Sequence, residues 1–157
     1  MVIFNSSTRF SNQVVKKVIL AQTDTTVGFL SQDAKRLKSI KDRESHKPFI
    51  TIYQDFRSLT TNIRVPNSKK SSIRRSKKTT FIVKGNSFRV VRYTKHSSFL
   101  RDMSWSFSTS ANRSKERFDR EFCENSVDII IEDKESLFEG KASKIYKIND
   151  KAIKRLR

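Results

Sequence analysis

The sequence predicts a mixed α/β fold, with one twisted sheet and helices packed on its faces. Short apolar, β-branched segments alternate along the chain with segments whose apolar residues recur every three or four positions. The length of 157 residues corresponds to one domain, and 12 Phe residues supply much of a hydrophobic core. We therefore expect a single domain over residues 1–157, in which residues 1–13 form a divergent N-terminal extension.

The first half is expected to contain two strands with a helix between them. Val14–Ala21 is apolar and β-branched, which favours a strand that ends at a Thr-rich segment. Asp33–Lys41 is predicted to be a helix, because Asp33 suits the N-cap and Ala34, Leu37 and Ile40 share one face. Pro48–Gln54 is predicted to be a strand from its alternating side chains.

The second half is expected to contain a hairpin, two helices and two more strands. The hairpin pairs Thr79–Lys84 with Phe88–Tyr93 across a Lys-Gly-Asn turn. Helices are predicted over His96–Ser104 and Lys115–Cys123, the second with Ser114 as its N-cap. Strands are predicted over Val127–Glu132 and Ser143–Ile148.

The charge of the chain is strongly positive. There are 34 Lys and Arg against 16 Asp and Glu, a formal net charge of +18, which favours a polyanionic partner such as nucleic acid. Apolar runs are too short to span a membrane, and the N-terminus lacks the pattern of a secretory signal, so we expect a cytoplasmic protein. The single Cys123 excludes an internal disulfide, and with two His it is too little for a zinc site.

The basic residues are densest in a window without acids, from Phe56 to Arg101, which contains 13 Lys and Arg. Its residues 67–78 are polar and lack apolar periodicity, so we expect a basic loop. This loop is either a solvated basic face or an RNA contact surface. The candidate RNA-binding residues are Lys69, Lys70, Arg74, Arg75, Lys77 and Lys78.

Three polar segments are candidates for chemistry, in a sequence that has no glycine-rich phosphate-binding motif. Gln22–Gly28 places hydroxyls at a strand end, which suits a polar substrate or an ordinary turn. Lys41 and Arg43 stand two residues apart and converge on one anion if the segment is extended; otherwise they complement a helix C-terminus. Ser110 and Asn112 offer a hydroxyl and an amide to a ligand, or cap a helix.

Taken together, these segments resemble the YrdC-like family of threonylcarbamoyl-AMP synthases. The family shows Thr-Asp-Thr-x-x-Gly at a strand end, as in Thr23–Gly28, and Lys-x-Arg-x-x-x-Lys-Pro before an apolar strand, as in Lys41–Ile52. Its Ser-Thr-Ser-Ala-Asn segment is identical to Ser108–Asn112, and its Arg-bearing strand is similar to Phe88–Arg92. The resemblance covers roughly residues 14–157 and becomes weak in the tail.

The resemblance implies an enzyme of tRNA modification that condenses L-threonine, bicarbonate and ATP into threonylcarbamoyl-adenylate and pyrophosphate. A tRNA threonylcarbamoyl transferase would be its partner, and Mg²⁺ would enter with ATP. The implied catalytic residues are Lys41, Arg43, Ser110 and Asn112. The implied threonine-binding residues are Thr23 and Thr25, and the implied nucleotide-binding residues are Lys47, Arg92, Ser108, Ser143 and Arg155.

The chain departs from the family pattern beside the implied threonine pocket. Gln22 stands where the family has Pro, and Thr26-Val27 replaces Val-Tyr, which removes an aromatic ring. A basic segment, residues 72–78, stands where a Pro-Gly-Pro motif is usual. Two hypotheses follow: an active threonylcarbamoyl-AMP synthase, or a non-catalytic protein of the same fold that binds tRNA or double-stranded RNA through its basic surface.

Overall fold

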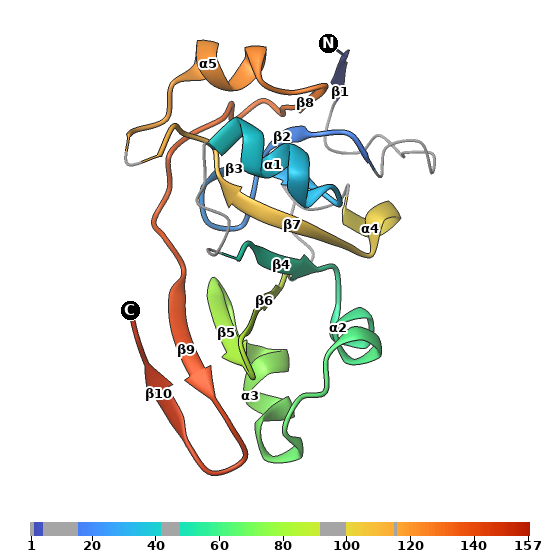
Figure 1. Ribbon diagram of the computed structural model, residues 1–157, viewed down its shortest axis with the longest axis vertical. Helices are drawn as coiled ribbons and strands as arrows, with labels where there is room; N and C mark the ends of the chain where they lie inside the picture. Colours follow the sequence, from blue (N-terminus) through green and yellow to red (C-terminus); the bar gives the residue numbers. More distant parts are fainter. Residues whose placement is uncertain (1, 5–15, 42–47, 92–99, 115) are drawn as a thin grey trace.

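The computed structural model describes residues 2–4, 16–41, 48–91, 100–114 and 116–157, and in them ten strands form one mixed sheet (Figure 1). The strand order is β1-β8-β2-β3-β7-β4-β6-β5-β9-β10. The strands are β1 Val2–Phe4, β2 Ile19–Gln22, β3 Val27–Ser31, β4 Ile50–Tyr53, β5 Thr79–Val83, β6 Asn86–Val90, β7 Trp105–Ser110, β8 Ile129–Ile131, β9 Lys144–Ile148 and β10 Ile153–Arg155.

Parallel and antiparallel pairs are mixed within this sheet. β1 and β2 lie on either side of β8 and run parallel to it. β4 runs parallel to β6, and β9 runs parallel to β5. The centre is antiparallel, where β7 pairs with both β3 and β4. This register places Ser110 opposite Gly28 and Ser108 opposite Ile50, so the end of β7 lies beside the hairpin that joins β2 to β3.

Helices cover the sheet, as the sequence predicts. They are α1 Ala34–Lys41, α2 Phe56–Asn62, α3 Lys70–Arg75, α4 Leu100–Met103 and α5 Arg120–Asn125, with a 3-10 turn, η2, at Asn67–Lys69. Figure 1 shows α1 and α5 over the end of the sheet that contains β8, β2 and β3, and α2 and α3 beside the other end. Side chains of α1 and α5, including Leu37 and Cys123, pack on Leu20 and Phe29.

The two faces of the sheet contain separate clusters of buried side chains. Because side chains alternate along a strand, Leu20 and Phe29 point to the face covered by α1 and α5, whereas Ile19 and Leu30 point to the other. The second face is packed with Leu100 and Met103 of α4. A third cluster joins the strands β4, β5 and β6 to helices α2 and α3; it includes Tyr53, Leu59, Ile73, Phe81 and Phe88.

The turn between β5 and β6 confirms the predicted hairpin. Val83 pairs with Asn86, and the two residues between them, Lys84 and Gly85, both have positive φ, 47° and 83°. Two consecutive residues with positive φ are typical of a type I′ turn, which matches the twist of the paired strands. Lys84 occupies a position that Asn or Gly fills with less strain.

Two expectations were wrong. Residues 67–78 are not a loop throughout, because η2 and α3 lie within them and the Ile73 side chain is buried against the third cluster. The helix expected over Lys115–Cys123 begins at Arg120, and its N-cap is Asp119 instead of Ser114. Within the expected N-terminal extension, residues 2–4 form the edge strand β1, which pairs with β8. The expected helix His96–Ser104 is described only from Leu100, where α4 begins.

Candidate active site

Lys41, at the last position of α1, contacts the end of β7 and the residues that follow it. Its ammonium donates hydrogen bonds to the carbonyl oxygens of Ser110 and Asn112, at 3.0 Å and 2.6 Å, and to Oδ1 of Asn112 at 2.5 Å. The residue is only 6% exposed. An ammonium has three protons, so these three acceptors match its donor capacity.

Asn112 connects the cluster internally. Its Oδ1 also accepts a hydrogen bond of 2.8 Å from the Ser110 hydroxyl, and its amide nitrogen donates to the carbonyl oxygen of Glu116. Asn112 is therefore not a helix cap, and its side chain is held by three groups. Ser110, in contrast, is exposed.

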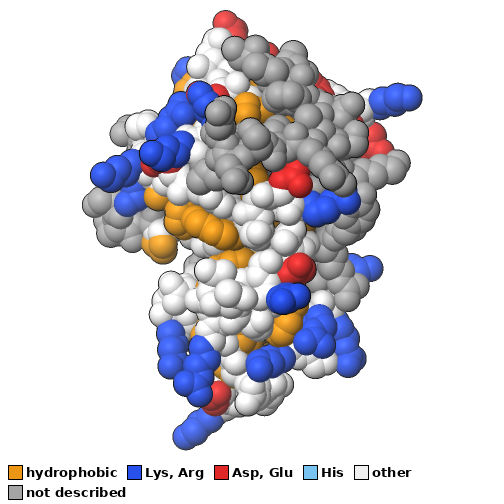
Figure 2. Space-filling view, turned by 90° about the vertical axis from the view of Figure 1, so that its right-hand side faces the viewer, with side chains coloured by type: hydrophobic (Ala, Val, Ile, Leu, Met, Phe, Trp, Pro, Cys, Tyr) orange, Lys and Arg blue, Asp and Glu red, His pale blue; other side chains and the backbone are white. Residues whose placement is uncertain are grey.

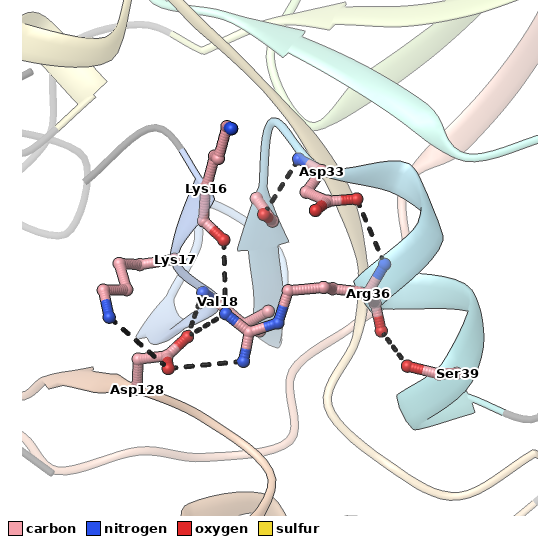
Figure 3. A network of polar contacts seen from close by, with 8 residues as sticks. Lys16, Lys17, Val18, Asp33, Arg36, Ser39 and Asp128 are labelled. Carbon is pink, nitrogen blue, oxygen red and sulfur yellow. Dashed lines mark hydrogen bonds and ion pairs between the residues drawn. The ribbon is translucent and has the colours of Figure 1, made fainter. Parts of the chain in front are cut away.

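An ion-pair network fixes α1, the helix that carries Lys41 (Figure 3). Arg36 donates to both carboxylate oxygens of Asp128, at 2.7 Å and 3.3 Å, and the Val18 amide donates to the same group at 2.8 Å. Partial burial would raise the pKa of Asp128, but these hydrogen bonds and the charges of Arg36 and Lys17 outweigh burial and lower the pKa below 3.8. Asp33 caps the same helix by accepting from the amides of residues 35 and 36.

The hairpin between β2 and β3 contains Thr23 and Thr25, whose side chains are buried and bonded to each other. Thr23 Oγ1 donates to the carbonyl oxygen of Thr26 at 2.7 Å and accepts from the backbone amides of Thr25 and Thr26. The two hydroxyl oxygens, of Thr23 and Thr25, are 3.2 Å apart. This hairpin adjoins the Lys41 cluster, because the Ala111 amide donates to the carbonyl oxygen of Val27.

A buried arginine that sequence reasoning missed lies behind this hairpin. Arg89 of β6 is 4% exposed; its Nη1 donates to Thr25 Oγ1 at 2.9 Å, and its Nε lies 3.4 Å from Oδ1 of Asp24. Burial lowers the pKa of Arg89, and the charge of Asp24 opposes that change. The sequence contains a signal for this burial. Arg89 is the single charged residue in the apolar segment Phe88–Val91, and residues two apart in a strand share a face, so Arg89 lies on the same face as Val91.

Residues that precede β9 pack closely against the same hairpin. Phe138 donates its amide to the side-chain oxygen of Gln22, and Gly140 donates its amide to Oγ1 of Thr26. A Cβ on Gly140 would lie 1.9 Å from the carbonyl oxygen of Thr25, so only glycine fits there. Gln22 thus anchors this segment through its side-chain oxygen, which the Pro usual in the family cannot do.

The remaining candidate residues are distributed along the sheet. Ser108 is buried on β7, two residues before Ser110. The Ser143 hydroxyl lies 2.9 Å from that of Thr80 on β5, and Ser143 follows Gly140, whose amide contacts Thr26 of the hairpin. Arg155 is exposed on the edge strand β10. Arg43, Lys47 and Arg92 lie outside the described residues.

The site offers hydrogen-bond donors and cations, without a reactive thiol. Burial raises the pKa of Cys123 to about 11, so the thiol is protonated at neutral pH. Among the described residues, no three His, Cys, Asp or Glu side chains gather to hold a metal ion. In the same part of the chain, no helix is long and apolar enough to cross a membrane.

Comparison with solved structures identifies the fold. The structure of H234A/Y235A P. abyssi Sua5 matches 99% of this chain and 59% of its own length, with a TM-score of 0.78 and 15% identity. P. abyssi Sua5 complexed with L-threonine matches 100% and 57%, with a TM-score of 0.77 and 17% identity. E. coli YciO matches 92% and 85%, with a TM-score of 0.73 and 20% identity. The chain has a YrdC-like fold.

This fold is shared by proteins of different size. The chain spans less than two thirds of P. abyssi Sua5, and T. kodakarensis HypF contains the fold within a much longer chain, of which 22% is matched. No protein-family model matches the sequence, and no curated protein sequence matches it significantly. At 13–20% identity, the likeness establishes the YrdC-like fold, and activity is a separate inference.

Proposed function

We propose that the protein is a threonylcarbamoyl-AMP synthase, which joins L-threonine, bicarbonate and ATP and releases pyrophosphate and water. The observation that carries this proposal is the convergence of Lys41, Ser110 and Asn112, about 70 residues apart in the chain, into one hydrogen-bonded cluster. Its support is the fold shared with a Sua5 that was solved in complex with L-threonine.

The chemistry requires positioned charge more than a nucleophilic side chain. The threonine amine combines with bicarbonate to give a carbamate and water, and a carbamate oxygen attacks the α-phosphorus of ATP as pyrophosphate leaves. Both steps gather anions, so fixed cations and N–H or O–H donors lower the barrier. Mg²⁺ would be held through the ATP phosphates and water.

Each side chain of the cluster has a distinct part in this proposal. Lys41 sets the shape of the Ser108–Asn112 segment and supplies a buried positive charge beneath it. The exposed Ser110 hydroxyl faces the reacting groups, and Asn112 orients that hydroxyl. Arg43, Lys47 and Arg92 are proposed to complete the anion site, and Ser108, Ser143 and Arg155 to contact the nucleotide.

The test is pyrophosphate release from ATP and bicarbonate with each amino acid supplied singly. The proposal expects release that depends on L-threonine and on bicarbonate. A matched pair of variants shows whether the cluster is responsible: Ser110→Ala, and Thr109→Ala, whose side chain points to the opposite face of β7. Release that is independent of every amino acid, or equal in both variants, would contradict the proposal.

Binding of tRNA or double-stranded RNA is a second candidate function, and a specific charge distribution favours it. Residues 56–91 and 144–157 contain 16 Lys and Arg and a single acid, Asp150. Both segments belong to the lower end of the molecule, where Figure 2 shows Lys and Arg side chains gathered. This end carries most of the net charge of +18.

A groove of about 1000 Å³ runs along that end, between the α2–η2 connection and the β9–β10 hairpin. Its cationic lining residues are Arg64, Lys70, Lys84, Lys147 and Lys154. No aromatic side chain is among its lining residues, so the groove suits a phosphate backbone better than unstacked bases. Of the six residues proposed from sequence to bind RNA, only Lys70 lines it; the guanidinium of Arg74 lies over the ring of Phe56, 4.6 Å from its centroid.

A further inference from the structure

We infer that Arg89 is a positioning residue for the candidate threonine pocket, acting through the hydroxyls of Thr25 and Thr23. The inference rests on the proposed function, because it concerns the amino-acid substrate of that reaction. It starts from an unusual placement: an arginine and an aspartate, both nearly buried, stand behind the β2–β3 hairpin.

Two of the hydrogen bonds that connect Arg89 with the hairpin have a fixed direction. A guanidinium donates and never accepts, so Arg89 Nη1 donates to Thr25 Oγ1. A carbonyl oxygen only accepts, so the single hydroxyl proton of Thr23 goes to the Thr26 carbonyl. Thr23 Oγ1 accepts the amides of Thr25 and Thr26 with its two lone pairs, so its contact of 3.2 Å with Thr25 Oγ1 does not fix the position of the Thr25 proton.

These hydrogen bonds determine which donors and acceptors the hairpin can offer to a substrate. Thr23 Oγ1 donates to one group and accepts from two amides within the hairpin, so it has no capacity left for a substrate. Thr25 Oγ1 accepts from Arg89 and retains its proton and one lone pair. With these it can donate to the carboxylate of an amino acid or accept from its ammonium group.

Asp24 offsets the free-energy cost of burying the Arg89 guanidinium. An isolated buried guanidinium is costly, and the carboxylate at 3.4 Å neutralises it. Neither Asp24 Oδ1 nor Arg89 Nε has a hydrogen bond among the described residues, so their attraction is mainly one of charge. The Nε side of the Arg89 guanidinium is thus held by the charge of Asp24, and its Nη1 orients the hydroxyl of Thr25.

The experiment compares three proteins: the wild type, Arg89→Met, and the double variant Asp24→Asn with Arg89→Met. The double variant removes both charges and avoids an unpaired buried carboxylate, so it keeps the test valid if Arg89→Met alone does not fold. In pyrophosphate release, we expect the KM for L-threonine to rise at least tenfold in both variants while the KM for ATP changes less than twofold. A Thr25→Val change should add little to either variant, because it removes the same chain of hydrogen bonds.

A second readout does not depend on activity. Hydrogen exchange of the Thr25 and Thr26 amides, which Thr23 Oγ1 holds, should accelerate in the double variant relative to the Leu30 amide of the neighbouring strand. Accelerated exchange at these amides without threonine-dependent release in the wild type would overturn the proposed function but keep the positioning role. An equal acceleration of hydrogen exchange at the Thr25, Thr26 and Leu30 amides would show that Arg89 has only a structural role and would overturn the inference. An equal rise of the KM for L-threonine and the KM for ATP would overturn it as well.

Discussion

The ammonium of Lys41 lies 2.5 Å from Oδ1 of Asn112, although 71 residues separate them in the sequence. This contact connects the end of α1 to the end of β7 and leaves Lys41 almost completely buried. A direct contact with solvent anions is therefore not how Lys41 acts in this structure. It supports the Ser110–Asn112 segment from beneath.

Lys41→Met should both destabilise the protein and reduce turnover. The change leaves three acceptors without their donor, and an unpaired buried group costs about 1–3 kcal/mol of the free energy of unfolding. We expect at least a tenfold lower rate of threonine-dependent pyrophosphate release, measured below the melting temperature. Lys35→Met, on the exposed side of the same helix, is the control and should change neither quantity appreciably.

Ser110→Ala should lower the rate with little effect on stability. The residue is exposed, and its hydroxyl donates to a single acceptor that Lys41 also holds. Thermal unfolding and pyrophosphate release measured on the same preparation separate the two effects. A lower melting temperature with full activity would assign Ser110 a structural role only.

Asp128 should make stability dependent on acid pH. Its pKa is lowered in the folded protein, so its stabilising contribution is present above the ordinary value of 3.8 and is lost as pH falls through the lower, folded value. The difference in free energy of unfolding between wild type and Asp128→Asn should therefore be largest near pH 6 and shrink below pH about 4. Asp150→Asn, at an exposed turn without an ion pair among the described residues, serves as the control. A difference that stays constant down to pH about 2 would contradict the assignment.

Lys84→Asn should stabilise the β5–β6 hairpin. Asn adopts positive φ at lower cost than Lys, so we expect a gain of about 0.5–1 kcal/mol in the free energy of unfolding. Gly85→Ala should have the opposite sign, because φ there is 83° while the space around it is open. Denaturant unfolding of both variants checks the turn type, and a destabilised Lys84→Asn protein would exclude it.

RNA binding should depend on the lower groove. Replacing Lys70, Lys84, Lys147 and Lys154 with Gln should reduce the slope of log affinity for tRNA against log salt by about three, at roughly 0.7–0.9 per phosphate contact. A control variant with Gln at four exposed positions elsewhere, Lys35, Arg117, Lys134 and Lys141, should keep the slope. Equal loss in both variants would mean that net charge alone attracts RNA.

Much of the fold could be predicted from the sequence because its strands and turns have local signals. Apolar β-branched runs predicted β2, β4 and β8, and the Lys-Gly turn predicted the β5–β6 hairpin. Helix α3 could not be predicted in this way, because Ile73 is the single apolar residue among its six, and burial of that residue depends on distant strands. A short helix of this kind is stabilised by tertiary packing, which a local pattern does not reveal.

The candidate site was predictable in part for the same reason. The family resemblance named Lys41, Ser110 and Asn112, and the structure brings them together. It gave no indication that the Thr23 and Thr25 hydroxyls bond to each other, or that Arg89 reaches them across the sheet. The contact between Arg89 and Thr25 depends on the strand order, which brings β6 within reach of the β2–β3 hairpin although 64 residues separate the two side chains in the sequence.

The most direct test of the proposed activity is detection of the product. The purified protein is incubated with L-threonine, ATP, Mg²⁺ and carbon-13 bicarbonate, and the nucleotides are analysed by mass spectrometry. The account predicts threonylcarbamoyl-adenylate that carries one carbon-13 atom, formed at least tenfold more slowly by Lys41→Met and Ser110→Ala than by wild type. Formation of no such adenylate by the folded wild-type protein would contradict it.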